Sequence, residues 1–155
     1  MSRAWNVGVK GSADQPWRLV RGTGLPVQDA PRRAAVDLEG SDSITPADGA
    51  TNMAVDAALL ESVQAGAPPV LRLYRWSPAC LSFGRNQPAR GRYDRDLAED
   101  RGIDFVRRPT GGQAVLHDDE LTYAVIAPVA VIGKPRTAYA AINRALVAAL
   151  RELGV

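Results

Sequence analysis

The segment RRPTGGQAVLHDDELTY, residues 107–123, decides both the expected fold and the expected site. It contains two adjacent arginines, a Gly-Gly pair and the only histidine of the chain. The runs on either side of the glycines are apolar or alternating, as strands are. The pattern predicts strands at 103–107 and 114–117 joined by a tight glycine hairpin, with a third strand at 121–128 after an acidic turn.

The glycine turn has a chemical interpretation. Glycines permit positive φ and close approach of a ligand, and exposed N–H groups in such a turn can bind an anion. Side chains alternate along a strand, so Arg107 and Arg108 should point to opposite faces, and one guanidinium can lie beside the turn. His117 should reach the same pocket. The residues alone leave two interpretations open: an anion site, or a plain hairpin with surface arginines and a structural histidine.

Working outward, the remaining elements indicate a mixed α/β (α+β) fold, with a largely antiparallel sheet flanked by helices. Residues 1–50 are read as a poorly patterned arm with one short strand, and residues 51–155 as the domain. The expected elements are a strand at 17–20, a helix at 52–66, strands at 70–76 and 80–84 that can form a hairpin, a helix at 94–102 capped by Asp94, and a helix at 137–153 capped by Thr137 and ended by Gly154.

Composition limits the possible classes of protein. The chain has 155 residues, 46% of them hydrophobic, and a net charge of +2, which gives no argument for nucleic acid as a partner. A single cysteine, Cys80, excludes an intramolecular disulfide and fits a reducing compartment. No apolar run is long enough to span a membrane, and the N-terminus has no signal-peptide core. We expect a cytoplasmic protein that does not engage a membrane.

Several side chains keep two interpretations. Cys80 is most simply a small buried core residue. Tyr74, Trp76 and Phe83 could line a tunnel for an acyl chain or form ordinary core. Arg85, in the sequence GRNQ, could contact phosphate or a carrier protein, or be solvated. The acidic residues 118–120 could bind magnesium or form an exposed turn.

The opening segment resembles the signature of the lipoate–protein ligase A and octanoyltransferase family, within the biotin/lipoate ligase superfamily. The signature is a double arginine, a Gly-Gly turn, Ala-Val, and a histidine followed by an acidic residue. Three further segments agree in the same order: WRLV at 17–20, GATNMAVDAALLESV at 49–63 and PPVLRLYRWSPACLSFGRNQ at 68–87.

The resemblance implies the fold of that catalytic domain and one of two activities. A ligase uses ATP and Mg²⁺ to convert lipoate to lipoyl-adenylate and then acylates a lysine of a lipoyl-carrier domain. Such carriers are the E2 subunits of 2-oxoacid dehydrogenases or the glycine-cleavage H protein. An octanoyltransferase delivers an octanoyl group and needs no cofactor. A third possibility is a non-catalytic remnant that binds the acyl group or the carrier.

The resemblance also implies roles for individual residues. Arg108 would face the acyl-phosphate region, with Arg107 as the weaker candidate. The backbones of Gly111, Gly112 and Ala114 would contact the ligand closely. Two further candidates are His117, which would line the same pocket, and Arg85.

The sequence departs from the family in two respects. Gln113 stands where many ligases have a third glycine, and octanoyltransferases vary there. Family members also continue further, through a segment like K-x-x-G-x-A with an essential lysine and, in some transferases, a nucleophilic cysteine. Neither segment occurs in these 155 residues. The expectation is therefore the N-terminal half of a catalytic domain, a fragment or truncated form that is inactive and only marginally stable alone.

Overall fold

The computed structural model describes residues 17–22 and 44–154, so most of the arm predicted at 1–50 lies outside the described residues. The chain divides into two compact units. The strand unit is Trp17–Ile126, and the described part of the helical unit runs from residue 127 to 154. No helix within the described ranges has the length and apolar character to cross a bilayer.

The strand unit is mixed α/β, as the sequence predicts. Its strands form two three-stranded sheets, in the orders β1-β2-β6 and β4-β3-β5. Each sheet combines one parallel pair with one antiparallel pair. The elements are β1 Arg18–Arg21, α1 Gly49–Gln64, β2 Val70–Tyr74, β3 Cys80–Phe83, α2 Arg95–Asp100, β4 Asp104–Arg107, β5 Val115–His117 and β6 Thr122–Ile126.

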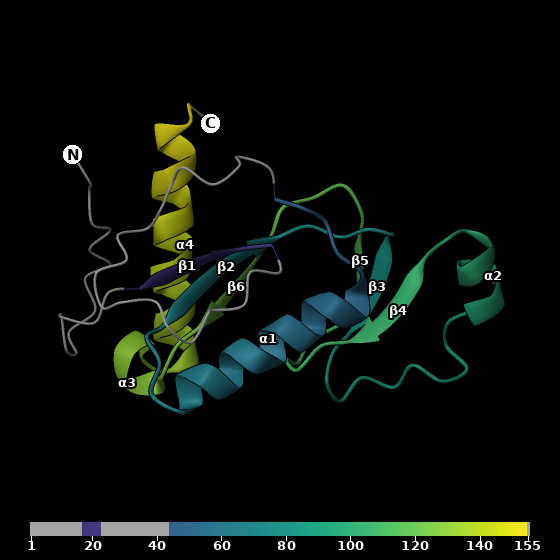
Figure 1. Ribbon diagram of the computed structural model, residues 1–155, viewed down its shortest axis with the longest axis horizontal. Helices are drawn as coiled ribbons and strands as arrows, with labels where there is room; N and C mark the ends of the chain where they lie inside the picture. The colour runs from purple at the N-terminus through teal and green to yellow at the C-terminus, as the bar shows by residue number, and fades with distance from the viewer. Residues whose placement is uncertain (1–16, 23–43, 155) are drawn as a thin grey trace. The chain divides into compact units, whose positions relative to one another are not determined.

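Two predicted hairpins are wrong. β2 does not pair with β3, because both edges of β2 are occupied by β1 and β6. β4 does not pair with β5, because the two strands flank β3 on opposite sides. Short connections at 75–79 and 118–121 carry the chain from one sheet to the other (Figure 1). Of the consecutive strands in the described residues, only β1 with β2 and β3 with β4 pair directly, in each case in parallel across an intervening helix.

Helix α1 packs against strands of both sheets (Figure 1). Its C-terminal part contributes to one buried cluster, which consists of Val20, Val55, Leu59, Val63 and Val70. Its N-terminal part contributes to a second, which consists of Met53, Tyr74, Trp76 and Cys80. The helix begins at Gly49, earlier than the predicted residue 52. A Cβ atom at Gly49 would lie 2.6 Å from the Cys80 Sγ atom, so glycine lets the helix approach β3 closely.

Asp48 caps α1, and its Oδ1 atom accepts a hydrogen bond of 2.7 Å from the Thr51 backbone N–H. This backbone hydrogen bond lowers the pKa of Asp48 below its ordinary value of 3.8. Because the folded pKa is lowered, the stabilisation is present above that ordinary value and is lost as pH falls through the lowered one. The cap therefore makes stability depend on pH in the acidic range.

We predict that Asp48→Asn will reduce this acid sensitivity. Asparagine caps helices about as well as aspartate but does not titrate. The melting temperatures of wild type and Asp48→Asn should be compared at about pH 6 and about pH 2.5, on either side of the ordinary aspartate pKa. On acidification, the melting temperature of the wild type should fall by more than that of the variant. Equal losses would show that the cap makes no contribution to the pH dependence.

The predicted cap of α2 is confirmed, because Asp94 Oδ1 accepts a hydrogen bond of 3.0 Å from the Leu97 backbone N–H. The helical unit contains α3 Val129–Ile132, which the sequence analysis did not anticipate, and α4 Pro135–Glu152. The predicted capping role of Thr137 is wrong. Lys134 occupies the N-cap position without a side-chain hydrogen bond, and Pro135 starts the helix, where a missing N–H costs nothing. Gly154 follows the helix with φ +81°, as expected.

Candidate functional site

The glycine turn, residues 109–113, crosses the end of β3 and lies on the GRNQ loop, residues 84–87. The Arg85 backbone N–H donates to the Thr110 carbonyl at 2.7 Å. A Cβ atom at Gly84 would overlap the Gly112 carbonyl oxygen and lie 2.9 Å from its carbonyl carbon. The turn and the loop therefore touch backbone to backbone, and only glycine at position 84 permits this contact.

The two glycines of the turn differ. Gly112 has φ +100°, in the region that favours glycine, and a Cβ there would lie 2.9 Å from an Arg108 guanidinium nitrogen. A Cβ at Gly111 would meet no atom within 4 Å, and this residue lacks a positive φ. Both are exposed. Within residues 17–22 and 44–154, their N–H groups have no protein acceptor. These two N–H groups are the donors that the turn can offer to an anionic ligand.

The two arginines hold different segments, as their alternation on the strand predicts. Arg108 donates to the Ser82 carbonyl at 2.9 Å, and to the carbonyls of Gly111 at 2.9 Å and Gln113 at 2.6 Å. It thus ties the turn to β3. Arg107 instead donates to backbone carbonyls of the GRNQ loop, among them Gly84 at 2.6 Å. Both guanidinium groups hold the protein backbone, and the pairing of one of them with an anionic ligand stays a prediction.

His117 lies close to Arg108 but is buried, with 9% of its surface exposed. Its Nε2 atom is 2.8 Å from the Ser82 hydroxyl oxygen, which also accepts a hydrogen bond of 3.1 Å from Arg108. Its Nδ1 atom is hydrogen-bonded to Glu120. The Trp76 ring stacks on the imidazole with a centroid distance of 4.1 Å. His117 is therefore linked to Arg108, and through it to the turn, by way of Ser82.

Two other predicted site residues make fewer contacts. Ala114 is partly buried between the turn and β5. Arg85 is exposed, and the hydrogen bond that fixes it to the turn comes from its backbone. Sequence reasoning missed Gln87, whose Oε1 atom accepts from the Gly84 N–H at 3.2 Å and whose Nε2 atom lies 3.5 Å from Gln113 Oε1. It also missed Ser82, although a serine inside the apolar strand CLSF was a usable signal.

The structure shows the surroundings of the aromatic and acidic residues to which the sequence gives two interpretations. Tyr74, Trp76 and Phe83 are buried core. Asp118 and Asp119 are exposed, and Asp119 pairs with Arg75 at 3.1 Å. In the described ranges, no group of three or more histidine, cysteine, aspartate or glutamate side chains is arranged to hold a metal ion.

Cys80 is fully buried, and burial raises the pKa of its thiol to about 12. The thiolate is the reactive form, so its fraction near neutral pH should be lower by on the order of a hundred- to a thousandfold than that of a free cysteine. Cys80 is a core residue and no nucleophile.

We predict that the Cys80 thiol of the folded protein will react with an aromatic disulfide reagent at least about a hundredfold more slowly than after unfolding. The single-cysteine sequence makes the absorbance signal easy to assign, and Cys80→Ala provides the blank. Rapid reaction under native conditions would show that the thiol is accessible.

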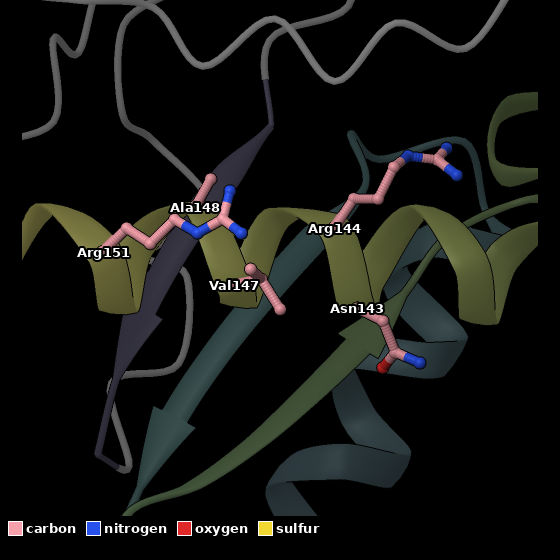
Figure 2. A pocket seen from close by; sticks show the side chains of 5 residues that line it. All are labelled: Asn143, Arg144, Val147, Ala148 and Arg151. Carbon is pink, nitrogen blue, oxygen red and sulfur yellow. The ribbon is translucent and has the colours of Figure 1, made fainter. Parts of the chain in front are cut away.

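A surface hollow of about 500 Å³ lies along α4, and its lining comes from that one helix: Asn143, Arg144, Val147, Ala148 and Arg151 (Figure 2). Its walls contain none of the predicted site residues. We therefore place the candidate site at the glycine turn.

The mixed α/β fold matches that of a solved lipoate-protein ligase A. Residues 48–155 match the model of the lipoyl protein ligase A/B catalytic domain, and the chain belongs to this family.

Relatives that are named as octanoyltransferases or as a lipoate-protein ligase agree with this family assignment. The octanoyltransferase LipM of Moorella thermoacetica is 49% identical over 109 residues, which cover 67% of this chain and 40% of the relative. LipM of Staphylococcus aureus is 45% identical over 107 residues, which cover 66% of this chain and 39% of the relative. A solved lipoate-protein ligase A bound with ATP superposes with a TM-score of 0.63 and 34% identity, covering 71% of this chain and 44% of that structure. The chain thus spans about 40% of the length of the curated relatives that it matches.

Proposed function

We propose that the protein carrying this chain transfers an octanoyl or lipoyl group to a lysine of a lipoyl-carrier domain. The acceptors would be E2 subunits of 2-oxoacid dehydrogenases or the glycine-cleavage H protein. One observation carries the proposal: in a chain of this family, Gly111 and Gly112 are exposed residues on a turn that Arg108 fixes to β3, and their N–H groups have no protein acceptor among the described residues. A fixed pair of N–H donors is what acyl transfer requires.

The N–H groups would act on developing negative charge. When an amine attacks an acyl carbon, the carbonyl oxygen becomes an oxyanion, and donors already in position stabilise it without reorganisation. Gly112 has φ +100° and contacts Gly84 backbone to backbone, so the turn cannot easily adopt another conformation. The same donors would serve the phosphate of an acyl-adenylate.

The preferred donor is an octanoyl thioester. The supporting observation is that the LipM octanoyltransferases are 49% and 45% identical, whereas the ligase structure is 34% identical. In this reaction the lysine amine attacks the thioester carbonyl, a C–N bond forms, the C–S bond breaks and the thiol leaves with the proton that the amine loses. Cys80 takes no part, because it is buried.

The second candidate is ATP-dependent ligation of lipoate, which the likeness to an ATP-bound ligase favours. Here ATP and Mg²⁺ are required. The lipoate carboxylate displaces pyrophosphate from ATP to give an acyl-adenylate, and the lysine amine then displaces AMP. Both candidates end in an amide bond to the same lysine of the carrier domain, but they differ in the acyl group and in how that group is activated.

The full-length protein should be incubated with a lipoyl domain and either an octanoyl thioester without ATP, or lipoate with ATP and Mg²⁺. Intact mass spectrometry of the domain reads the product. We expect an octanoyl adduct in the first mixture; an adduct only in the second would select the ligase. A domain whose acceptor lysine is replaced by arginine is the control. No adduct in either mixture, with a correctly folded protein, would overturn the proposed function.

A further inference from the structure

A row of hydrogen bonds runs from the glycine turn into the interior of the strand unit. It begins at Arg108, whose guanidinium holds the turn and also donates to the Ser82 hydroxyl at 3.1 Å. Ser82 is 1% exposed, and its hydroxyl oxygen lies 2.8 Å from His117 Nε2. The row continues from the other side of the imidazole, where Nδ1 is hydrogen-bonded to Glu120.

The far end of the row comes from β6 and from the connection that follows β2. The Thr122 hydroxyl donates to the same Glu120 oxygen at 2.8 Å. The Trp76 indole N–H donates to the Thr122 hydroxyl at 2.7 Å, while the Trp76 ring stacks on His117. The hydrogen-bonded row therefore has six members: Arg108, Ser82, His117, Glu120, Thr122 and Trp76.

The chemistry of the end groups fixes the position of every proton between them. Arginine and the tryptophan indole can only donate, and a carboxylate can only accept. Arg108 donates to one lone pair of the Ser82 oxygen, and in a neutral imidazole whose Nδ1 carries the proton, Nε2 accepts the single Ser82 proton. Because Glu120 only accepts, His117 Nδ1 must carry the imidazole proton. All donors therefore point toward Glu120, and a single tautomer of His117 satisfies them.

Glu120 is suited to be the acceptor at the centre of this arrangement. Partial burial tends to raise the pKa of its carboxyl, but the hydrogen bonds from His117 and Thr122 outweigh that effect and lower it. The carboxylate is therefore the form present near neutral pH. Ser82, His117 and Glu120 resemble a serine-nucleophile triad in their order, but Ser82 is buried and its oxygen is bonded to Arg108, so it cannot attack a substrate.

We propose that Ser82, Glu120 and Thr122 are positioning residues that hold His117 as the Nδ1–H tautomer and thereby fix Arg108 and the glycine turn. The role in catalysis rests on the proposed function, whereas the tautomer does not. If Nε2 carried the proton instead, the Ser82 proton would lose its acceptor and an unprotonated Nδ1 would face the Glu120 carboxylate, so the row that supports Arg108 and the turn would weaken. The effect reaches the ligand only through Arg108 and the carbonyls of Gly111 and Gln113.

The tautomer can be measured directly. Nitrogen-15 spectra of labelled histidine distinguish a protonated from an unprotonated ring nitrogen, and the loss of a signal in His117→Ala assigns it. Spectra should be recorded at about pH 8, above the ordinary histidine pKa of about 6.5. We expect Nδ1–H in wild type. Wild-type Nε2–H would overturn the proposal, whatever the variants do.

Variants then test the coupling to the turn. Glu120→Ala should populate the Nε2–H tautomer and lower kcat for acyl transfer by about ten- to a hundredfold, because small displacements of positioned groups cost this much. Glu120→Gln keeps an acceptor oxygen, so it should restore most of the Nδ1–H tautomer and most of the wild-type kcat. Asp119→Ala removes a neighbouring carboxylate outside the row and should change neither the tautomer of His117 nor kcat. A Glu120→Ala protein with the wild-type tautomer would contradict the inference.

The variant Ser82→Ala provides a second, independent test of the coupling. It should retain the Nδ1–H tautomer, because Glu120 remains, yet lower kcat, because Arg108 loses its link to His117. A Ser82→Ala protein with wild-type kcat would contradict the coupling. If the wild-type protein shows Nδ1–H but transfers no acyl group, the proposed function fails while the positioning of His117 stands.

Discussion

Replacement of Gly84 by alanine should lower the rate of acyl transfer by on the order of a hundredfold. The added Cβ would overlap the Gly112 carbonyl oxygen, and the atoms on both sides of this contact belong to the backbone. No side chain can rotate to relieve it, so the glycine turn must move away from the GRNQ loop. Displacing catalytic groups by about 1 Å can cost about 10²-fold in rate. Overpacking of this kind also destabilises by about 1–3 kcal/mol.

The control for backbone effects is Gly111→Ala. A Cβ at Gly111 meets no atom within 4 Å, so this protein should keep the melting temperature of the wild type. Gly84→Ala should melt at a lower temperature and lose activity together. Octanoyl transfer is read by the mass of the carrier domain. A Gly84→Ala protein with wild-type rate and stability would contradict the close packing of turn and loop.

Loss of the Asp56 carboxylate should destabilise the strand unit by about 3–5 kcal/mol. Arg72 is fully buried, and its NH1 atom donates to Asp56 Oδ1 at 2.6 Å. The other donors of Arg72 bind the Asn52 carbonyl and side chain and the Gly22 carbonyl, at 2.8–3.0 Å. In Asp56→Ala the arginine keeps its neutral partners but loses its counter-charge. A buried charge without a partner carries a large desolvation penalty.

The exposed pair Arg75–Asp119 is the matched control, because its side chains are 43% and 94% exposed. Asp119→Ala should cost less than about 1 kcal/mol. Replacing both Arg72 and Asp56 by apolar residues of similar size should recover much of the loss, since no charge is then stranded. Urea unfolding of the variants provides the measurement. Equal effects of Asp56→Ala and Asp119→Ala would show that burial does not determine how much an ion pair contributes to the free energy of unfolding.

Local signals in the sequence predicted individual elements well. Alternation in VLRLY marks β2 and places Arg72 on the same face as Val70 and Tyr74, which is the buried face. An aspartate at position 94 before a short helical pattern marked a real cap. These signals operate within a few residues, where propensity and hydrogen bonding decide the conformation.

The pairing of strands could not be predicted in this way. Short connections favour pairing of consecutive strands, but β2 and β3 both have their edges filled by strands from distant parts of the chain. The partners of Arg72 lie 16 and 20 residues earlier, on α1, and become visible only when the helix packs on the sheet.

The candidate site shows the same division. The motif identified the glycine turn, its arginines and His117. It gave no role to Thr122, although that residue lies within the motif segment. It did not identify Ser82, which meets the motif only because β5 pairs with β3. The supporting residues of a site depend on tertiary contacts, whereas the backbone turn that binds a ligand has a local sequence signature.

The central claim is that the exposed N–H groups of the glycine turn receive the acyl donor. The most direct test is a titration of the nitrogen-15-labelled protein with an unreactive octanoyl amide analogue of the thioester, followed by amide chemical shifts. The account predicts the largest changes at Gly111 and Gly112, with smaller changes at Gln113. Largest changes along the α4 hollow around Val147, or binding that leaves the turn amides unchanged, would contradict it.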